Sequence, residues 1–197
     1  FLISSNVYPT AIFVAIFANN IVLSQFLGIC PYLGVSDRLE TSLGMGIAVI
    51  FVMTMSAVVT WVIDTFLLVQ FDLVYLRTIT FILVIAGLVQ LVEMVLKKTN
   101  PTLFRALGIY LPLITTNCTI LGVALLNVQA GYNIIQTIVY AISTGVGFTL
   151  AMVIMAGIRE RLDLADVSSY LRGAAVSLVT AGILSLAFMG FKGMMTL

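Results

Sequence analysis

Two cysteines carry most of the chemistry that this sequence offers. The 197 residues contain only Cys30 and Cys118, and they contain no histidine. Cys30 begins the segment CPYLGV and Cys118 begins the segment CTILGV, so the same pattern stands once in each half of the chain. Thiolates are soft ligands that select iron–sulfur clusters, zinc or copper(I). This matched pair predicts that the two thiols share one metal-binding site.

Two interpretations of the cysteines are open at this level. A [2Fe–2S] cluster takes four cysteine ligands, so two thiolates would need a second chain to supply the others. A free cysteine is otherwise most often a small buried packing residue. The symmetric placement of Cys30 and Cys118 favours the metal interpretation over packing.

Glycine and polar residues interrupt the apolar sequence before each cysteine. Asn20 and Gly28 precede the first cysteine, and Thr116 and Asn117 precede the second. Amides and hydroxyls at membrane depth need hydrogen-bond partners. They either line an ion path or satisfy the backbone of an unwound segment, and we favour the second role. These four residues are the predicted supports of the cysteine site.

The composition predicts an integral membrane protein with several spans. Hydrophobic residues make up 61% of the chain and charged residues 9%, whereas soluble domains have about 25% charged residues. Mean hydropathy is +1.20. A helix crosses the bilayer with roughly 20 apolar residues, and no alternation typical of barrel strands is visible. The protein is therefore expected to lie in a lipid bilayer. Its net charge of +1 does not indicate a nucleic-acid partner.

We predict an all-α fold with six transmembrane helices, of which the first and fourth are broken near the cysteines. The first apolar run is expected to be a span and not a cleaved signal peptide, and a few residues are expected to precede Phe1. The expected spans are Tyr8–Val35, Leu43–Val69, Ile79–Leu96, Leu103–Leu126, Ile134–Ile158 and Ala174–Met195.

Most basic residues fall in three of the connections between these spans. Cytoplasmic loops carry the excess of Lys and Arg, so these connections are expected in the cytoplasm and both termini on the outer side. The residues in question are Arg38, Lys97, Lys98, Arg105, Arg159, Arg161 and Arg172, against Arg77 and Lys192 on the opposite side. Residues 1–98 and 99–197 then form two inverted three-helix repeats, and interrupted helices in matching positions indicate the functional site.

Other polar and small residues have simpler predicted roles. The glycines of Gly44–Gly46 and Gly145–Gly147 are expected to allow close helix packing. Asp64 lies near the outer end of the second span with Arg77 as its expected partner. The mixed charges of Asp37–Glu40 and Gly157–Val167 indicate docking surfaces or solvated turns.

No nucleotide-binding motif, catalytic triad or carboxylate pair is visible in the sequence. The chain is therefore not expected to be catalytic alone. Any chemistry with NADH or flavin is expected to belong to other subunits.

Several segments carry a resemblance to a known family. NNIVLSQFLGICPYLGVS, LRTITFILVIAGLVQLVEMVLKK, LGIYLPLITTNCTILGVALLN, AGIRERL and TAGILSLAFMGF occur in this order. Together they resemble the A subunits of the bacterial Rnf ion-translocating electron-transport complex, which are related to the E subunits of the sodium-translocating NADH:quinone reductase. The resemblance covers essentially the whole chain.

The resemblance implies a role in electron transfer across the bacterial inner membrane. Rnf complexes pass electrons between ferredoxin and NAD and couple this to sodium or proton translocation. By resemblance, Cys30 and Cys118 supply two ligands of an intramembrane [2Fe–2S] cluster. A homologous E-type subunit of opposite topology supplies the other two. The further implied partners are the flavin-bearing D and G subunits and the iron–sulfur B and C subunits.

The alternative is a secondary ion transporter or channel subunit with inverted repeats and no cluster. In that case the cysteines are packing residues, and replacing both by alanine leaves transport intact.

Overall fold

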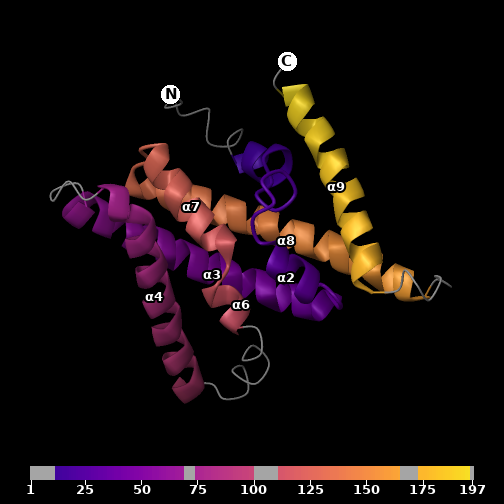
Figure 1. Ribbon diagram of the computed structural model, residues 1–197, viewed down its shortest axis with the longest axis horizontal. Helices are drawn as coiled ribbons and strands as arrows, with labels where there is room; N and C mark the ends of the chain where they lie inside the picture. The colour runs from indigo at the N-terminus through magenta and orange to yellow at the C-terminus, as the bar shows by residue number, and fades with distance from the viewer. Residues whose placement is uncertain (1–11, 69–73, 100–110, 165–172, 196–197) are drawn as a thin grey trace. The chain divides into compact units, whose positions relative to one another are not determined.

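The computed structural model describes residues 12–68, 74–99, 111–164 and 173–195, and no strand occurs among them. The described elements are helical, which confirms the all-α prediction for this part of the chain (Figure 1). In chain order they are η1 (Val14–Ala18), α2 (Ile29–Gly34), α3 (Leu39–Ile63), η2 (Asp64–Leu68), η3 (Val74–Leu76), α4 (Arg77–Thr99), α6 (Leu111–Thr115), α7 (Cys118–Gln129), α8 (Ile134–Leu164) and α9 (Ala174–Met195).

Four helical stretches in the described residues are long and apolar enough to cross a membrane. They are Leu39–Leu68, Arg77–Met94, Pro112–Gln129 and Ile134–Leu164, and a shorter apolar helix covers Ala175–Phe191. The expectation of a polytopic helical membrane chain is therefore supported. The count of six spans and the inverted repeats of residues 1–98 and 99–197 stay predictions.

Parts of the expected first and fourth spans fall outside the described residues. This applies to residues 8–11 of the first span, to residues 103–110 of the fourth and to the loop cations Arg105 and Arg172. Where the two runs are described, each is interrupted. The first is split between η1 and α2, and the fourth is split between α6 and α7. The predicted helix breaks before the two cysteines are thus present.

The chain forms two compact units, which are described separately. The first contains Phe1–Ile47 and Ser143–Leu197, and the second contains Ala48–Ile142. Cys30 belongs to the first unit and Cys118 to the second.

In the first unit, α9 packs against η1 and α2 (Figure 1). Close helix packing depends on two glycines of the predicted small-residue motifs. A Cβ on Gly46 of α3 would collide with the Thr149 side chain of α8, and a Cβ on Gly147 would lie 3.2 Å from the Ile16 Cα. Gly44 has open space around it. The packing role is therefore confirmed for Gly46 and Gly147.

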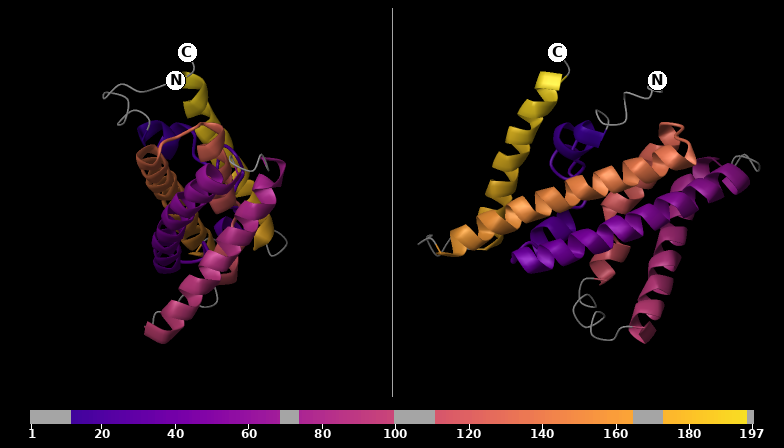
Figure 2. Two further views of the ribbon diagram at one scale, coloured as in Figure 1. Left: turned by 90° about the vertical axis from the view of Figure 1, so that its left-hand side faces the viewer. Right: turned by 180° about the vertical axis from the view of Figure 1, so that it is seen from behind.

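In the second unit, α4 packs against α6 and α7 (Figure 2). One face of α4 is buried through Phe81, Ile85 and Val89, which recur every four residues. Apolar side chains such as Ile79 and Leu83 stay exposed on this helix, as expected for a surface that contacts lipid.

Two polar contacts join neighbouring elements of the second unit. Arg77 Nε donates to Asp64 Oδ1 at 2.7 Å, which confirms the predicted partnership. Trp61 Nε1 donates to the Tyr132 carbonyl oxygen at 2.8 Å and so ties α3 to the turn before α8.

Candidate metal centre

The irregular chain between η1 and α2 is organised by the fully buried Asn20. Its Nδ2 donates to the carbonyl oxygens of Ile16 at 3.1 Å and Gly147 at 2.7 Å. Its Oδ1 accepts from the backbone nitrogens of Val22 at 3.1 Å and Leu23 at 3.4 Å. Because unpaired backbone groups are costly away from water, Asn20 replaces bonds that the helix break removes. These bonds to the backbone agree with a backbone-satisfying role, which stays a prediction.

Cys30 is the second residue of α2, and its side chain is exposed. Gly28 stands at the N-cap with φ 84°, in the left-handed region that glycine adopts without a steric penalty. Phe26 also has a positive φ of 57°. The tight backbone path before α2 therefore presents the Cys30 thiol at the surface of the chain.

Cys118 is the first residue of α7, and its side chain is partly buried. Asn117 is the N-cap, where its Oδ1 accepts from the Thr119 backbone nitrogen at 3.0 Å. Thr116 Oγ1 donates to the Pro112 carbonyl oxygen at 2.9 Å. The positive end of a helix favours negative charge, so this position suits a metal-binding thiolate.

Each cysteine, described within its own unit, has a setting that fits a thiolate ligand of a [2Fe–2S] cluster. Cys30 and Cys118 are not joined in a disulfide, and each follows a helix break. The buried Asn117 Nδ2, beside Cys118, has no hydrogen-bond partner within the described residues, which suits it to donate to a cluster sulfur. The described residues hold no group of three or more His, Cys, Asp or Glu side chains that could bind a metal. The sequence contains two cysteines, so the four cysteine ligands of a [2Fe–2S] cluster would need a second chain.

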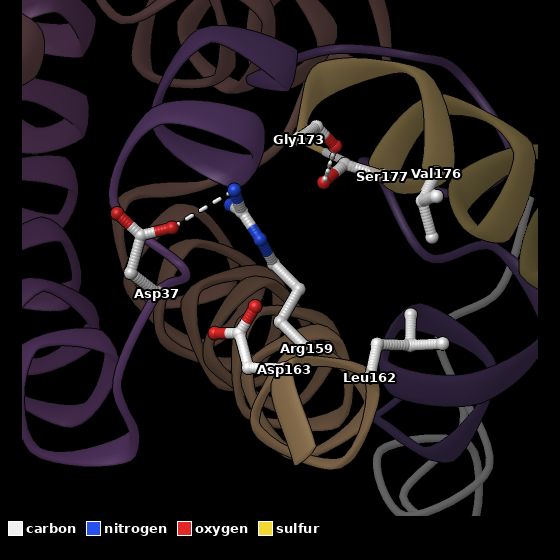
Figure 3. A pocket seen from close by; sticks show the side chains of 7 residues that line it. All are labelled: Asp37, Arg159, Leu162, Asp163, Gly173, Val176 and Ser177. Atoms are coloured by element: carbon white, nitrogen blue, oxygen red, sulfur yellow. Dashed lines mark hydrogen bonds and ion pairs between the residues drawn. The ribbon is translucent and has the colours of Figure 1, made fainter. Parts of the chain in front are cut away.

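Arg159, which the sequence placed in the loop after the fifth span, lies within α8, because that helix continues to Leu164. Arg159 Nη1 donates to the Leu33 carbonyl oxygen at 2.8 Å and to Ser36 Oγ at 3.1 Å. Its Nη2 lies 2.8 Å from Asp37 Oδ1. A dashed line in Figure 3 marks this ion pair. The sequence assigned these charges to docking surfaces or solvated turns. The bond to Leu33 was not predictable because a backbone carbonyl carries no residue-type signal.

Residues 8–195 match the Rnf-Nqr family, which is described as "Rnf-Nqr subunit, membrane protein". The chain belongs to the Rnf-Nqr family. The Rnf-Nqr match includes both cysteines and the helices on either side of each.

Individual Rnf-Nqr relatives are similar over nearly their whole length. The Serratia proteamaculans protein named as the A subunit of the ion-translocating oxidoreductase complex is 60% identical over 179 residues, which cover 91% of this chain and 93% of the relative. The protein of the same name from Citrobacter koseri is 57% identical over 182 residues, 92% of this chain and 94% of the relative. The Escherichia coli K12 protein of that name gives the same identity and coverage.

Proposed function

We propose that this chain is the A-type membrane subunit of an Rnf ion-translocating oxidoreductase complex. The observation that carries the proposal is the 60% identity, over 91% of the chain, to a protein named as the A subunit of such a complex. The apolar spans and the absence of a nucleotide-binding motif from the sequence agree with a subunit that works only within a complex.

Cys30 and Cys118 supply two of the four ligands of an intramembrane [2Fe–2S] cluster in this proposal. A homologous E-type subunit of opposite topology supplies the other two. Support comes from the placement of each thiol just after a helix break and from the partly buried start of α7. The chain lies in the inner membrane with both termini on the outer side, in agreement with the excess of basic residues in the three predicted cytoplasmic loops.

The bound cluster would supply one-electron transfer across the apolar barrier between the iron–sulfur B and C subunits and the flavin-bearing D and G subunits. Residues of this chain hold the ligands in place. Asn20 fixes the broken backbone before Cys30, and Asn117 caps the helix that begins at Cys118. Reduction would change the charge of the bound cluster. Coupling to sodium or proton movement would follow if that change alters which side of the two repeats is open.

Electron paramagnetic resonance (EPR) of the assembled complex tests the ligand assignment. The dithionite-reduced complex is measured at low temperature beside Cys30→Ser and Cys118→Ser variants that retain all subunits. A rhombic [2Fe–2S] signal that each variant loses or shifts is the expected result. An assembled complex without iron and without a signal that depends on these cysteines would contradict the proposal.

The coupling step needs a separate measurement. Membrane vesicles with the Cys30→Ala/Cys118→Ala complex should show neither sodium nor proton uptake, although the subunits are assembled. Uptake that continues in these vesicles would favour a transporter in which the cysteines only pack. Comparing sodium with proton uptake in wild-type vesicles identifies the coupling ion.

A further inference from the structure

The helix that carries Cys30 needs support from outside itself. α2 has six residues, and isolated helices shorter than about 12 residues are marginal because nucleation is costly. No side chain caps its N-terminus at Gly28. Its last carbonyl groups also lack partners within the helix, as at every helix end. The position of the thiol therefore depends on what holds the end of α2.

Arg159 of α8 supplies that support. Its Nη1 donates to the Leu33 carbonyl oxygen in the last turn of α2, at 2.8 Å. The same Nη1 donates at 3.1 Å to Ser36 Oγ, which in turn donates to the Tyr32 carbonyl oxygen at 2.6 Å. One guanidinium group thus satisfies one terminal carbonyl directly and a second through a hydroxyl. A cation is also favourable at a helix C-terminus.

The guanidinium group is itself held in place. Asp37 Oδ1 lies 2.8 Å from Nη2 (Figure 3), and the Arg159 side chain is 19% exposed. On the next residue of α8, Glu160 Oε1 accepts from the Leu39 backbone nitrogen at 3.1 Å. The turn after α2 is therefore fixed to α8 at successive positions.

We propose that Arg159 is a positioning residue for Cys30, which acts through the C-terminus of α2 and sets where the thiol is presented. Leu33 is one helical turn from Cys30, so freeing the Leu33 carbonyl removes a restraint on the turn that carries the thiol. The inference rests on the proposed function for its consequence in electron transfer. The placement of the thiol by Arg159 is a property of this chain alone.

A nitroxide label on Cys30 tests the positioning directly. The full chain carrying Cys118→Ser is labelled in bicelles, and the EPR line shape is compared for wild type, Arg159→Ala, Arg159→Lys and Arg161→Ala. Arg161 is exposed on the same helix and serves as the matched control. Arg159→Ala should increase the mobile fraction of the label, Arg159→Lys should partly restore the wild-type line shape, and Arg161→Ala should leave it unchanged.

A second label separates local positioning from general unfolding. The chain carrying Cys30→Ser is labelled at Cys118, which lies in the other compact unit. This label should keep its line shape in Arg159→Ala. An unchanged Cys30 label in Arg159→Ala, or equal mobilisation of both labels, would overturn the inference.

The assembled complex provides the link to the cluster. Arg159→Ala should shift or broaden the reduced [2Fe–2S] signal, while Arg161→Ala should not. A wild-type complex without any cluster signal would refute the proposed function but leave the label result standing. A cluster signal that is identical in wild type and Arg159→Ala would refute the positioning role at the cluster.

Discussion

Asn20 Nδ2 donates to the Gly147 carbonyl oxygen at 2.7 Å, a bond between residues 127 positions apart in the sequence. It fixes the unwound chain before Cys30 to the middle of α8. Gly147 also permits the approach, because a Cβ there would lie 3.2 Å from the Ile16 Cα. The helix break before Cys30 is therefore stabilised by specific contacts with α8.

Replacing Asn20 should destabilise the first unit strongly. Asn20→Ala removes the side-chain partner of two carbonyl and two amide groups, and each buried amide left without a partner costs about 1–3 kcal/mol. We expect the detergent-solubilised variant to unfold at a clearly lower temperature than the wild-type protein. Size-exclusion chromatography after heating measures the fraction that remains folded. Asn19→Ala is the control, since the Asn19 side chain accepts one long bond of 3.4 Å from Ser24 Oγ. Equal stability of the two variants would contradict the organising role of Asn20.

The two glycines at the start of α3 should differ in their tolerance of a methyl group. Gly46→Ala should destabilise the protein by about 1–3 kcal/mol because its Cβ meets the Thr149 side chain. Gly44→Ala, with open space around the new Cβ, should be neutral or slightly stabilising. Thermal unfolding of both variants checks the difference. The addition of Thr149→Ala removes the two nearest atoms but leaves a Cβ 2.9 Å away, so it should rescue Gly46→Ala only in part and should not alter the effect of Gly44→Ala.

The Asp64–Arg77 pair should show measurable coupling. Their side chains are only 10% and 22% exposed, and two hydrogen bonds of 2.7 Å and 3.4 Å join them. Arg77→Gln or Asp64→Asn alone leaves one charge without its partner, and a coupling of about 1–3 kcal/mol is expected. A double-mutant cycle of thermal stability measures it. If the two single effects simply add in the double variant, the pair contributes no interaction energy.

The ends of α8 should be accessible from opposite sides of the membrane. α8 has 31 residues, more than the roughly 20 that a span requires. In a chain with both native cysteines replaced by serine, Asp163→Cys should react with an impermeant maleimide from the cytoplasmic side only. Gln129 is the exposed last residue of α7, beside the turn that leads into α8, so Gln129→Cys should react from the outer side only. Labelling of right-side-out and inverted vesicles distinguishes this topology from its reverse.

The sequence by itself determined the helical membrane class, the matched cysteine patterns, the break before each cysteine and the Asp64–Arg77 pair. These features follow from composition, from local helix-breaking residues and from opposite charges at the ends of neighbouring spans. These features can be predicted from the sequence because each depends on residue types within a short stretch or on a charged side chain that needs a partner of opposite charge.

Only the tertiary structure decided which distant groups hold the segment around Cys30. Asn20 reaches the Gly147 carbonyl, Arg159 reaches the Leu33 carbonyl and Ser185 Oγ reaches the Leu23 carbonyl at 2.6 Å. Every residue has a backbone carbonyl, so the sequence does not indicate which carbonyl accepts the bond. Which side chains come within reach of these carbonyls depends on how α8 and α9 pack against the broken chain.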